Sequence, residues 1–424
     1  MTKEADMEYG LIGEKLGHSF SKVIHNMIGS YQYELQEIPQ NEIDAFMRAK
    51  DFRGINVTIP YKQTVIPYLD SISDRAKKIG AVNTIVNRGG RLFGDNTDYI
   101  GLKSLIERND ILINGKKVLI LGTGGTSKTA YTVVSDMGAA SVCKVSRHAE
   151  NEDADVKVIT YDDAVRDYND AQIIINTTPV GMFPQNENVP INIEDFPMLE
   201  GVVDVIYNPL VTRLVRNAKA HNIKAANGLY MLVKQAVAAS EKFFDTEYDN
   251  SLTENIFAKV TSMKQNIVLI GMPGCGKSTV GKALSRLGGR TMVDTDILIA
   301  EKFGMEIPQI FAQFGEETFR NAESEVIREV SQQTGIVIST GGGAILRPEN
   351  VSALKANGVI FFLDRPIDDI RPTANRPLSQ DRAALQQRYN ERYGIYTQTA
   401  DVHIKVDARQ DDIARRILKI IHNS

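Results

Sequence analysis

The stretch Gly271-Met-Pro-Gly-Cys-Gly-Lys277-Ser278 decides the fold of the second part of this chain. The apolar, β-branched run at residues 266–270 predicts a short buried strand before it, and residues 279–286 predict a helix after it. A strand, a glycine-rich turn, Gly-Lys-Ser and a helix are typical of a P-loop, whose backbone N–H groups surround a phosphate. Lys277 would reach the outer phosphates and the Ser278 hydroxyl would hold Mg²⁺. We therefore predict nucleotide binding here rather than a glycine turn without a ligand.

The composition, 42% hydrophobic and 24% charged, is ordinary for a soluble globular protein. The 424 residues leave room for two or three domains. A net charge of −4 argues against a broad nucleic-acid footprint. Cys143 and Cys275 lie far apart without metal-type spacing, which fits a reducing, cytoplasmic setting. No apolar run has membrane-spanning length and the N-terminus is not a signal peptide, so we expect no membrane partner. A monomer and a homodimer both stay open.

Polar side chains follow several predicted strands in the first hundred residues. The two hydroxyls of Ser19 and Ser21 lie at a strand-to-helix turn and suit a small anion, although serine is also an ordinary helix cap. A β-branched strand runs into Pro60, and Lys62 comes just beyond it, where ligand sites of α/β sheets collect. Lys62 alone could equally be a solvated surface charge. The stretches 80–84 and 94–98 add Asn, Thr and Asp side chains that could bind a polyhydroxylated ligand.

A dinucleotide-binding turn follows the fully apolar strand predicted at residues 117–121. The turn is Gly122-Thr-Gly-Gly-Thr-Ser127, and the helix after it is expected from Lys128 to Met137. Ser127 replaces the usual third glycine and is still small enough for close helix–strand packing. After the next strand, residues 141–145, Ser146-Arg147 stands in place of the acidic residue that binds a free ribose 2′-hydroxyl. This favours NADP over NAD, although Arg147 could be a simple loop cation.

The remaining pattern alternates strands and helices. A long helix is predicted at Leu229–Phe244, where Gln235 is either a satisfied core group or a ligand contact. Residues 245–264 turn polar and acidic, which predicts a linker that is helical from Leu252 to Met263. The strand–helix rhythm after residue 266 predicts a three-layer P-loop kinase-like domain. Residues 371–377, cationic and rich in turn formers, are expected to form a flap over the phosphates.

The first half of the chain resembles shikimate dehydrogenase. The resemblance rests on His18-Ser-Phe-Ser21, Asn56-Val-Thr-Ile-Pro-Tyr-Lys62, Gly80-Ala-Val-Asn-Thr84, Asn96-Thr-Asp98 and Tyr207-Asn-Pro. It implies Lys62 and Asp98 as the catalytic pair. It assigns the substrate to Ser19, Ser21, Thr58, Asn83, Asp98, Tyr207 and Gln235, and NADP(H) to Gly122, Gly124, Gly125, Ser146, Arg147, Gly228 and Met231. Lys15 and Lys22 replace prolines of the family pattern, and Ser146-Arg147 replaces Asn-Arg.

The second half, from about residue 264, resembles shikimate kinase. The resemblance rests on the P-loop, Asp294-Thr-Asp296, Arg320, Gly341-Gly-Gly343 and Arg392. It implies Mg²⁺ at Ser278 and Asp294, and shikimate at Asp296, Arg320, Gly342 and Arg392, with Phe319 and Glu323 in support. It assigns ATP to Gly274, Cys275, Gly276, Lys277, Ser278, Thr279, Arg371 and Arg376, and catalysis to Asp296, Lys277 and Arg376. The lid around Arg376 is a residue or two shorter than the family pattern.

Together the resemblances imply an α/β chain of three folded domains. Residues 1–99 plus 228–247 would bind the substrate of the dehydrogenase, residues 100–227 would form its NADP-binding Rossmann domain, residues 248–263 a linker, and residues 264–424 the P-loop kinase. The implied function is reduction of 3-dehydroshikimate by NADPH, then phosphorylation of shikimate by ATP, in aromatic amino acid biosynthesis. Two alternatives are one active half fused to a degenerate regulatory half, and a kinase half that acts on a nucleotide. The first alternative is disfavoured because both halves keep their catalytic residues, Lys62 and Asp98 in one and Lys277, Ser278 and Asp296 in the other. The second is disfavoured because Asp296, Arg320 and Arg392 suit a small hydroxylated carboxylate better than a nucleobase.

Overall fold

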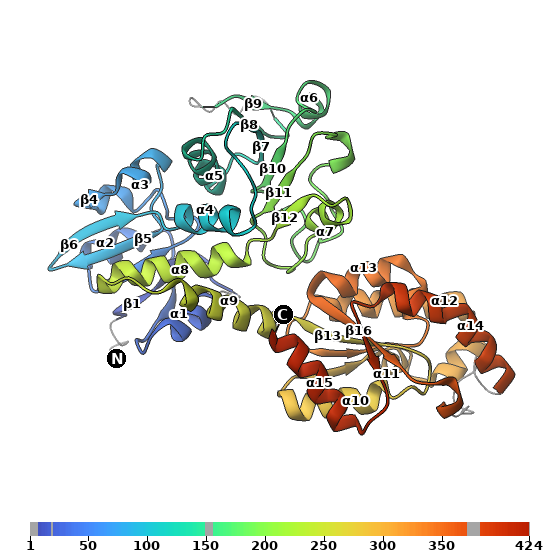
Figure 1. The fold of residues 1–424 in the computed structure, drawn as a ribbon. Helices are drawn as coiled ribbons and strands as arrows, with labels where there is room; N and C mark the ends of the chain where they lie inside the picture. Colours follow the sequence, from blue (N-terminus) through green and yellow to red (C-terminus); the bar gives the residue numbers. More distant parts are fainter. Residues whose placement is uncertain (1–6, 18–19, 149–155, 371–381, 424) are drawn as a thin grey trace. The chain divides into compact units, whose positions relative to one another are not determined.

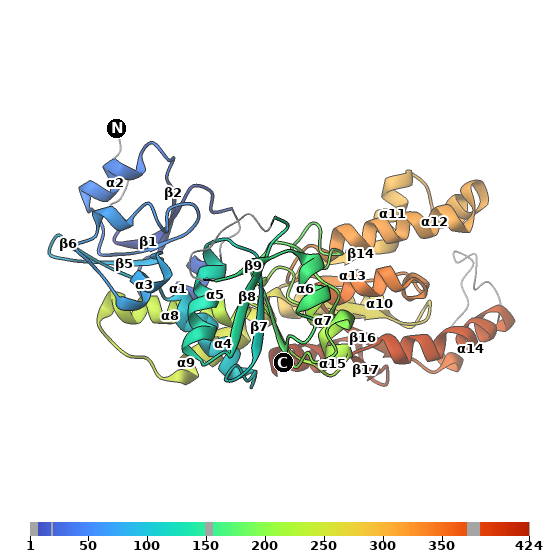
Figure 2. The ribbon, with the colours of Figure 1, turned by 90° about the horizontal axis from the view of Figure 1, so that it is seen from above.

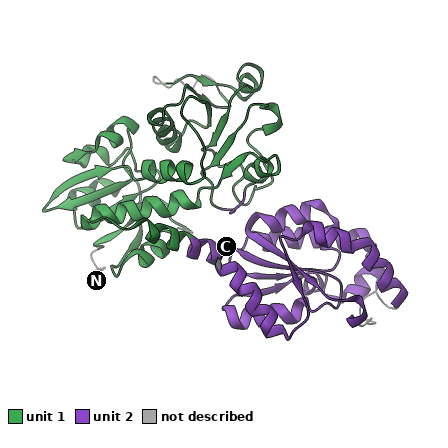
Figure 3. Ribbon diagram, in the orientation of Figure 1, with its two compact units in different colours: residues 1–207, 212–257 green, residues 208–211, 258–424 purple. Residues whose placement is uncertain are grey.

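The structure, a computed structural model, describes residues 7–17, 20–148, 156–370 and 382–423 and contains three β-sheets flanked by helices (Figure 1). The chain divides into two compact units (Figure 3). The first comprises residues 1–207 and 212–257, and the second comprises residues 208–211 and 258–424. Among the described residues, no helix is both long enough and apolar enough to cross a membrane.

The first sheet of the first unit has the strand order β2-β1-β3-β5-β6-β4. Its strands are β1 (Tyr9–Gly13), β2 (Glu34–Glu37), β3 (Gly54–Val57), β4 (Ser71–Ile72), β5 (Thr84–Arg88) and β6 (Arg91–Asp95). Its helices are α1 (Ser21–Ile28), α2 (Ile43–Ala49), η1 (Ile66–Tyr68) and α3 (Asp74–Ile79). β1 runs parallel to β2 and β3, whereas β5 is antiparallel to β3 and β6. β3 ends at Val57, earlier than the predicted run into Pro60.

The second sheet of the first unit is entirely parallel, in the order β12-β11-β10-β7-β8-β9. Its strands are β7 (Lys117–Leu121), β8 (Ser141–Val145), β9 (Val158–Ile159), β10 (Ile173–Asn176), β11 (Gly201–Asp204) and β12 (Lys224–Ala226). Its helices are α5 (Gly125–Asp136), α6 (Tyr161–Asp167), η2 (Ile193–Asp195) and α7 (Arg213–Ala220). The strand order reverses between β7 and β10, and a crevice for ligands opens at such a point.

The helix α5 begins at Gly125, three residues before the predicted start at Lys128. The cause is Ser127, whose backbone N–H and hydroxyl both donate to the Gly124 carbonyl, at 3.0 and 2.6 Å. The first turn of the helix therefore forms inside the glycine-rich turn, which brings the helix N-terminus to the crevice.

Two helices connect the sheets of the first unit. Figure 1 shows α4 (Asp98–Arg108) and α8 (Leu229–Phe244) side by side at the junction. Gly101 allows this approach, because a Cβ there would lie 2.6 Å from the Met231 carbonyl oxygen and 3.2 Å from the Gln235 Cβ. α8 has its predicted bounds. The stretch predicted as a linker contains a helix, α9 (Asn250–Lys264), and the boundary between the two units falls within it.

The second unit is a three-layer α/β/α domain with a parallel sheet in the order β14-β15-β13-β16-β17. The strands are β13 (Asn266–Ile270), β14 (Met292–Asp294), β15 (Val337–Ser339), β16 (Gly358–Asp364) and β17 (Val402–Lys405). The helices are α10 (Lys277–Gly288), α11 (Thr295–Phe303), α12 (Ile307–Ser331), η3 (Ala344–Leu346), α13 (Pro348–Asn357), η4 (Ile367–Asp369), α14 (Arg382–Thr399) and α15 (Gln410–Asn423). α11 and α12 lie side by side (Figure 2). β13 is central, so the turn that follows it opens at the middle of the sheet edge.

Candidate active sites

The predicted lysine and aspartate of the first unit form an ion pair. Lys62 Nζ lies 2.6 Å from Asp98 Oδ2, and the two side chains are 25% and 17% exposed. Lys62 follows β3 and its carbonyl accepts from the Val82 N–H at 2.8 Å, while Asp98 begins α4. A charge-assisted hydrogen bond of this length keeps the ammonium oriented and accessible to a ligand.

A buried polar network fixes the start of α4. Asn83 Oδ1 accepts from the backbone N–H of Thr97 at 2.7 Å, and Thr97 immediately precedes Asp98. Asn56 Nδ2 donates to the Asn83 carbonyl at 3.2 Å and to the Thr84 hydroxyl at 3.1 Å. Asn83 thus positions Asp98, whatever else it contacts. The sequence analysis did not assign Asn56, Thr84 or Thr97, and the signal was a polar residue inside the otherwise apolar β3.

The other predicted substrate contacts of the first unit lie on neighbouring elements. Thr58 follows β3 and its N–H donates to the Ile12 carbonyl at 3.0 Å, whereas Ser21 begins α1 and is buried. Gln235 Nε2 donates to the Leu232 carbonyl at 3.0 Å. Tyr207 follows β11, and burial raises the pKa of its hydroxyl. Ser19 lies outside the described residues. A shared ligand contact for this set stays a prediction.

The glycine-rich turn after β7 has the shape that a pyrophosphate requires. Gly122 has a φ of +104°, and a Cβ there would lie 2.9 Å from Thr177 Oγ1 at the end of the neighbouring β10. Gly124 and Gly125 face open space, since a Cβ at either would meet nothing within 4 Å. A phosphate can therefore approach the backbone at the N-terminus of α5. This geometry fits a dinucleotide.

The residues predicted to select NADP lie beside this turn. Ser146-Arg147 follows β8, and the Gly122 N–H donates to the Val145 carbonyl at 2.8 Å. Arg147 is exposed, as a cation that meets a 2′-phosphate must be. Packing alone requires a glycine at position 228, because a Cβ there would lie 1.9 Å from the Val205 carbonyl oxygen. Met231 is buried against α4. Cofactor contacts of Gly228 and Met231 stay predictions.

A buried carboxylate that the sequence analysis missed organises the loop before Tyr207. Asp204 Oδ2 accepts from the Thr212 hydroxyl at 2.7 Å, and its Oδ1 accepts from Asn176 Nδ2 and the Ile206 N–H, both at 3.1 Å. Burial raises the pKa of Asp204 from 3.8 to about 6, although the three donors partly offset this. The carboxylate thus holds both ends of the 205–211 loop. Its ionisation while buried lowers the free energy of unfolding near neutral pH.

We expect Asp204→Asn to remove a pH dependence of stability. The folded pKa lies above the unfolded value, so this group favours folding below about pH 4, and that contribution is lost as the pH rises through about 6. The shift corresponds to at most about 3 kcal/mol. The free energies of urea unfolding of wild type and Asp204→Asn should therefore agree below about pH 4, diverge in favour of the variant between about pH 4 and 6, and keep a constant difference at higher pH. Asp170→Asn on the surface is the control, and parallel pH profiles of wild type and Asp204→Asn would contradict the prediction.

The P-loop of the second unit opens into a cavity of about 380 Å³. Lys277 Nζ donates to the carbonyls of Gly271 and Met272, at 2.8 and 3.2 Å. Residues 274, 276, 278 and 279 line the same cavity. Cys275 differs from them, since its side chain is fully buried in the core. The lysine and the loop backbone fit the phosphates of a nucleotide.

Ser278 and Asp294 offer the donor set for a magnesium ion. Ser278 Oγ donates to Asp294 Oδ2 at 2.7 Å, and both residues line the cavity. Mg²⁺ is usually held by one or two protein oxygens together with substrate phosphates and water. One hydroxyl and one carboxylate beside the P-loop meet that requirement. Among the described residues, no group of three or more His, Cys, Asp or Glu side chains could hold a metal by itself.

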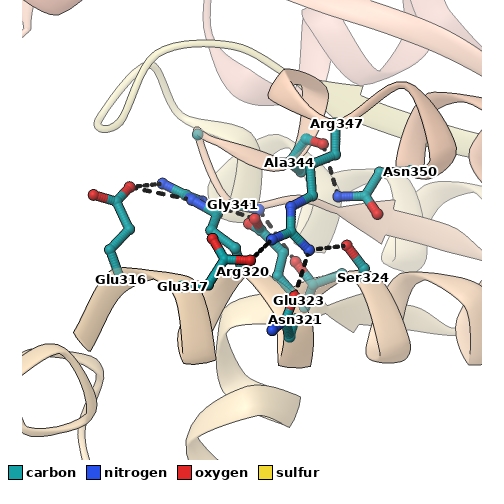
Figure 4. Close-up of polar contacts among 12 residues, drawn as sticks. Glu316, Glu317, Arg320, Asn321, Glu323, Ser324, Gly341, Ala344, Arg347 and Asn350 are labelled. Atoms are coloured by element: carbon teal, nitrogen blue, oxygen red, sulfur yellow. Dashed lines mark hydrogen bonds and ion pairs between the residues drawn. The ribbon is translucent and has the colours of Figure 1, made fainter. Parts of the chain in front are cut away.

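The predicted acceptor residues line the same cavity. Figure 4 shows Arg320 and Glu323 among them. Arg320 Nη1 lies 2.7 Å from Glu323 Oε2, and Arg392 Nη1 donates to the Gly342 carbonyl at 3.0 Å. Burial raises the pKa of Glu323, and Arg320 partly offsets this. Asp296 lines the same cavity. Two arginines beside carboxylates suit a small anion that also carries hydroxyl groups. Arg371 and Arg376 lie outside the described residues.

The three glycines after β15 form a wall of this cavity that admits no side chain. A Cβ at Gly341 would lie 2.6 Å from Asp296 Oδ1, and one at Gly342 would lie 2.8 Å from the Pro273 ring. A Cβ at Gly343 would lie 2.2 Å from Arg320 Nη1. The sequence analysis placed this loop in the site but did not identify Tyr396, whose hydroxyl donates to the Gly342 carbonyl at 2.5 Å.

Gly343→Ala should displace Arg320 and weaken binding of the anionic acceptor. The clash is with the end of a flexible side chain, so the fold should persist while the guanidinium moves. Loss of one hydrogen bond to a charged group costs about 1.5–3 kcal/mol, so we expect the acceptor KM to rise about 10–100-fold. Gly394→Ala is the control, because a Cβ there meets nothing within 4 Å and alanine favours helix α14. Equal acceptor KM values in the two variants would contradict this account.

Comparisons with known proteins match parts of both units. The family model "Shikimate dehydrogenase substrate binding domain" matches residues 11–85, and the model "Shikimate kinase" matches residues 273–422. A shikimate dehydrogenase (NADP(+)) of Clostridium beijerinckii is 39% identical over 262 residues, which is 59% of this chain and 96% of the relative.

Solved structures resemble the same part of the chain. A chorismate mutase/shikimate 5-dehydrogenase fusion protein from Clostridium acetobutylicum is 37% identical, covers 61% of this chain and 98% of its own, and has a TM-score of 0.57. Shikimate 5-dehydrogenase from Thermus thermophilus, solved with NADP(H) and shikimate, is 29% identical over 60% of this chain and 99% of its own, with a TM-score of 0.54. The chain therefore belongs to the shikimate dehydrogenase family and carries a shikimate kinase domain in residues 273–422.

Proposed function

We propose that this protein catalyses two consecutive reactions, the reduction of 3-dehydroshikimate to shikimate by NADPH and the phosphorylation of shikimate by Mg·ATP. One observation carries the proposal. A lysine–aspartate pair lies in a unit with a dinucleotide turn, and a second unit joins a P-loop to an arginine–carboxylate cluster. The product of the first site is the substrate of the second. We also place the enzyme in the cytoplasm, in line with two free, buried cysteines.

In the first reaction Lys62 acts as the general acid. The turn at Gly122, Gly124 and Gly125 would hold NADPH, which would supply the hydride for the C3 carbonyl carbon of the substrate. The Lys62 ammonium then gives a proton to the carbonyl oxygen, which becomes the C3 hydroxyl, and water restores the proton. Asp98, 2.6 Å away, orients the ammonium. Ser19, Ser21, Thr58, Asn83, Tyr207 and Gln235 are proposed to bind the substrate.

In the second reaction Asp296 orients and deprotonates the C3 hydroxyl of shikimate for attack on the γ-phosphorus of ATP. The bond from that phosphorus to the bridging oxygen breaks, and ADP leaves. Lys277 and Arg376, which was predicted to lie in the lid, would stabilise the charge on the transferring group, and Ser278 and Asp294 would hold Mg²⁺. Arg320 and Arg392 bind the shikimate carboxylate. Positioning and electrostatics account for most of the rate in such transfers.

A coupled assay tests the whole proposal. Purified protein is given 3-dehydroshikimate, NADPH and Mg·ATP, and shikimate 3-phosphate is measured. We expect the phosphorylated product to form and NADPH and ATP to be consumed in equal amounts. If only NADPH or only ATP is consumed, the substrate of the silent reaction is added directly. A reaction that stays silent even then would support a degenerate half instead.

A nucleotide acceptor is the alternative for the kinase unit. The paired arginines and carboxylates of the acceptor cluster favour a small hydroxylated acid over a nucleobase. Nucleoside monophosphates in place of shikimate should therefore give no ADP above the background rate.

A further inference from the structure

Arg320 is held on two sides by glutamates of its own helix (Figure 4). Glu323, one turn later on α12, binds Nη1 at 2.7 Å. Glu316, one turn earlier, accepts through its Oε1 from Nη2 at 3.0 Å and from Nε at 3.3 Å. All three guanidinium nitrogens of Arg320 therefore donate to glutamates of this protein.

The two glutamates differ in how firmly they can hold the arginine. The Glu323 side chain is 1% exposed, and breaking a buried pair by removal of one partner is strongly unfavourable. The Glu316 side chain is 53% exposed, and ion pairs with an exposed partner contribute only about 0–1 kcal/mol. Glu323 is thus a permanent partner of Arg320, whereas Glu316 can be exchanged for another anion.

Glu316 occupies the Nε–Nη2 edge of Arg320. Nε and Nη2 donate in parallel and match the two oxygens of a carboxylate. A substrate carboxylate that binds this edge has to replace Glu316. The exchange conserves the charge around Arg320, so its cost is set mainly by the strength of the Glu316 contact.

The backbone directly before Glu316 is not helical. Gly315 has φ +80° and ψ 170°, which interrupts α12 directly before Glu316. A Cβ at Gly315 would meet nothing within 4 Å. The carboxylate also acts on Arg388 of α14, since the pKa of Arg388 is lowered mainly by burial and the Glu316 charge partly offsets this. Arg388 lines the same cavity as Arg320.

We infer that Glu316 is an internal competitor for the substrate carboxylate and sets the affinity of the kinase unit for its acceptor. The inference rests on the proposed function, in which Arg320 binds the carboxylate of shikimate. Glu316 does not touch the reacting atoms in this account. It raises the acceptor KM and leaves the phosphoryl-transfer step unchanged.

The test compares Glu316→Gln with Glu317→Gln in the full-length protein. Glu317 is the next residue of the same helix and its carboxylate lies 2.8 Å from Arg347 rather than Arg320. The two substitutions remove the same charge from nearly the same place, so they separate direct competition from a general electrostatic effect. We expect Glu316→Gln to lower the shikimate KM about 3–5-fold, the equivalent of an exposed ion pair. Its kcat should stay within about twofold, and Glu317→Gln should match wild type.

Three results would overturn the inference. An unchanged KM in Glu316→Gln would mean that the substrate does not displace this glutamate. A higher KM would mean that Glu316 supports binding by positioning Arg320. An equal fall in both variants would mean that only the overall charge matters. Failure of the proposed function is separate, because wild-type protein would then form no ADP in response to shikimate.

Discussion

Lys62→Ala should reduce NADPH oxidation with 3-dehydroshikimate by about 10²–10⁴-fold, the usual contribution of a positioned general acid. Lys62 Nζ lies 2.6 Å from Asp98 Oδ2, and alanine removes the proton donor and leaves the carboxylate without its cation. A carboxylate left at this point also repels the negative charge that develops on the carbonyl oxygen. Initial rates of NADPH absorbance loss at saturating substrate measure the effect.

The same preparation provides the internal control for Lys62→Ala. ATP consumption with added shikimate should match wild type, because each unit carries its own hydrophobic core and its own site. Lys77→Ala, an exposed lysine of α3, should leave both activities intact. A folded Lys62→Ala protein that keeps more than about one tenth of the rate would exclude Lys62 as the proton donor.

Lys277→Ala should produce the converse result, with phosphoryl transfer to shikimate lowered about 10²–10³-fold, the cost of removing one donor to a transition-state anion. The ammonium, now bound to the carbonyls of Gly271 and Met272, is the cation that the P-loop can turn toward the transferring phosphoryl group. Formation of ADP in a coupled assay at saturating shikimate measures the loss.

Reduction of 3-dehydroshikimate should be unaffected by Lys277→Ala. Lys282→Ala is the matched control, since Lys282 lies on the same helix α10 but is exposed. Loss of both activities in a folded Lys277→Ala or Lys62→Ala protein would show that the two sites do not work independently.

The fold could be predicted best where burial is continuous. β7, β8, β13 and α8 have their predicted bounds because each is an apolar run whose neighbours change character abruptly. The prediction was less accurate where a local hydrogen bond decides the boundary. The Ser127 hydroxyl donates to the Gly124 carbonyl, and α5 begins three residues earlier than predicted. The helix predicted at Leu252–Met263 does form, as α9 (Asn250–Lys264), with Ile256 and Val260 buried on one face.

Only the site residues that belong to a sequence motif could be predicted. Lys62 and Asp98 are 36 residues apart in sequence, and the resemblance paired them before the structure placed them in contact. Glu316 and Asp204 carry no motif signal, because their roles depend on which donors the tertiary structure brings to them. Contacts of this kind follow from packing, which the order of residues alone does not specify.

The wall formed by Gly341, Gly342 and Gly343 has a consequence for inhibitor resistance. Any other residue at these positions would meet the polar cluster at Asp296 and Arg320 or the Pro273 ring. A compound that binds through contacts with this backbone would therefore face a surface that mutation cannot reshape without harm to the acceptor or nucleotide site. Escape would have to arise elsewhere, and exposed positions such as Glu316 are where we expect it.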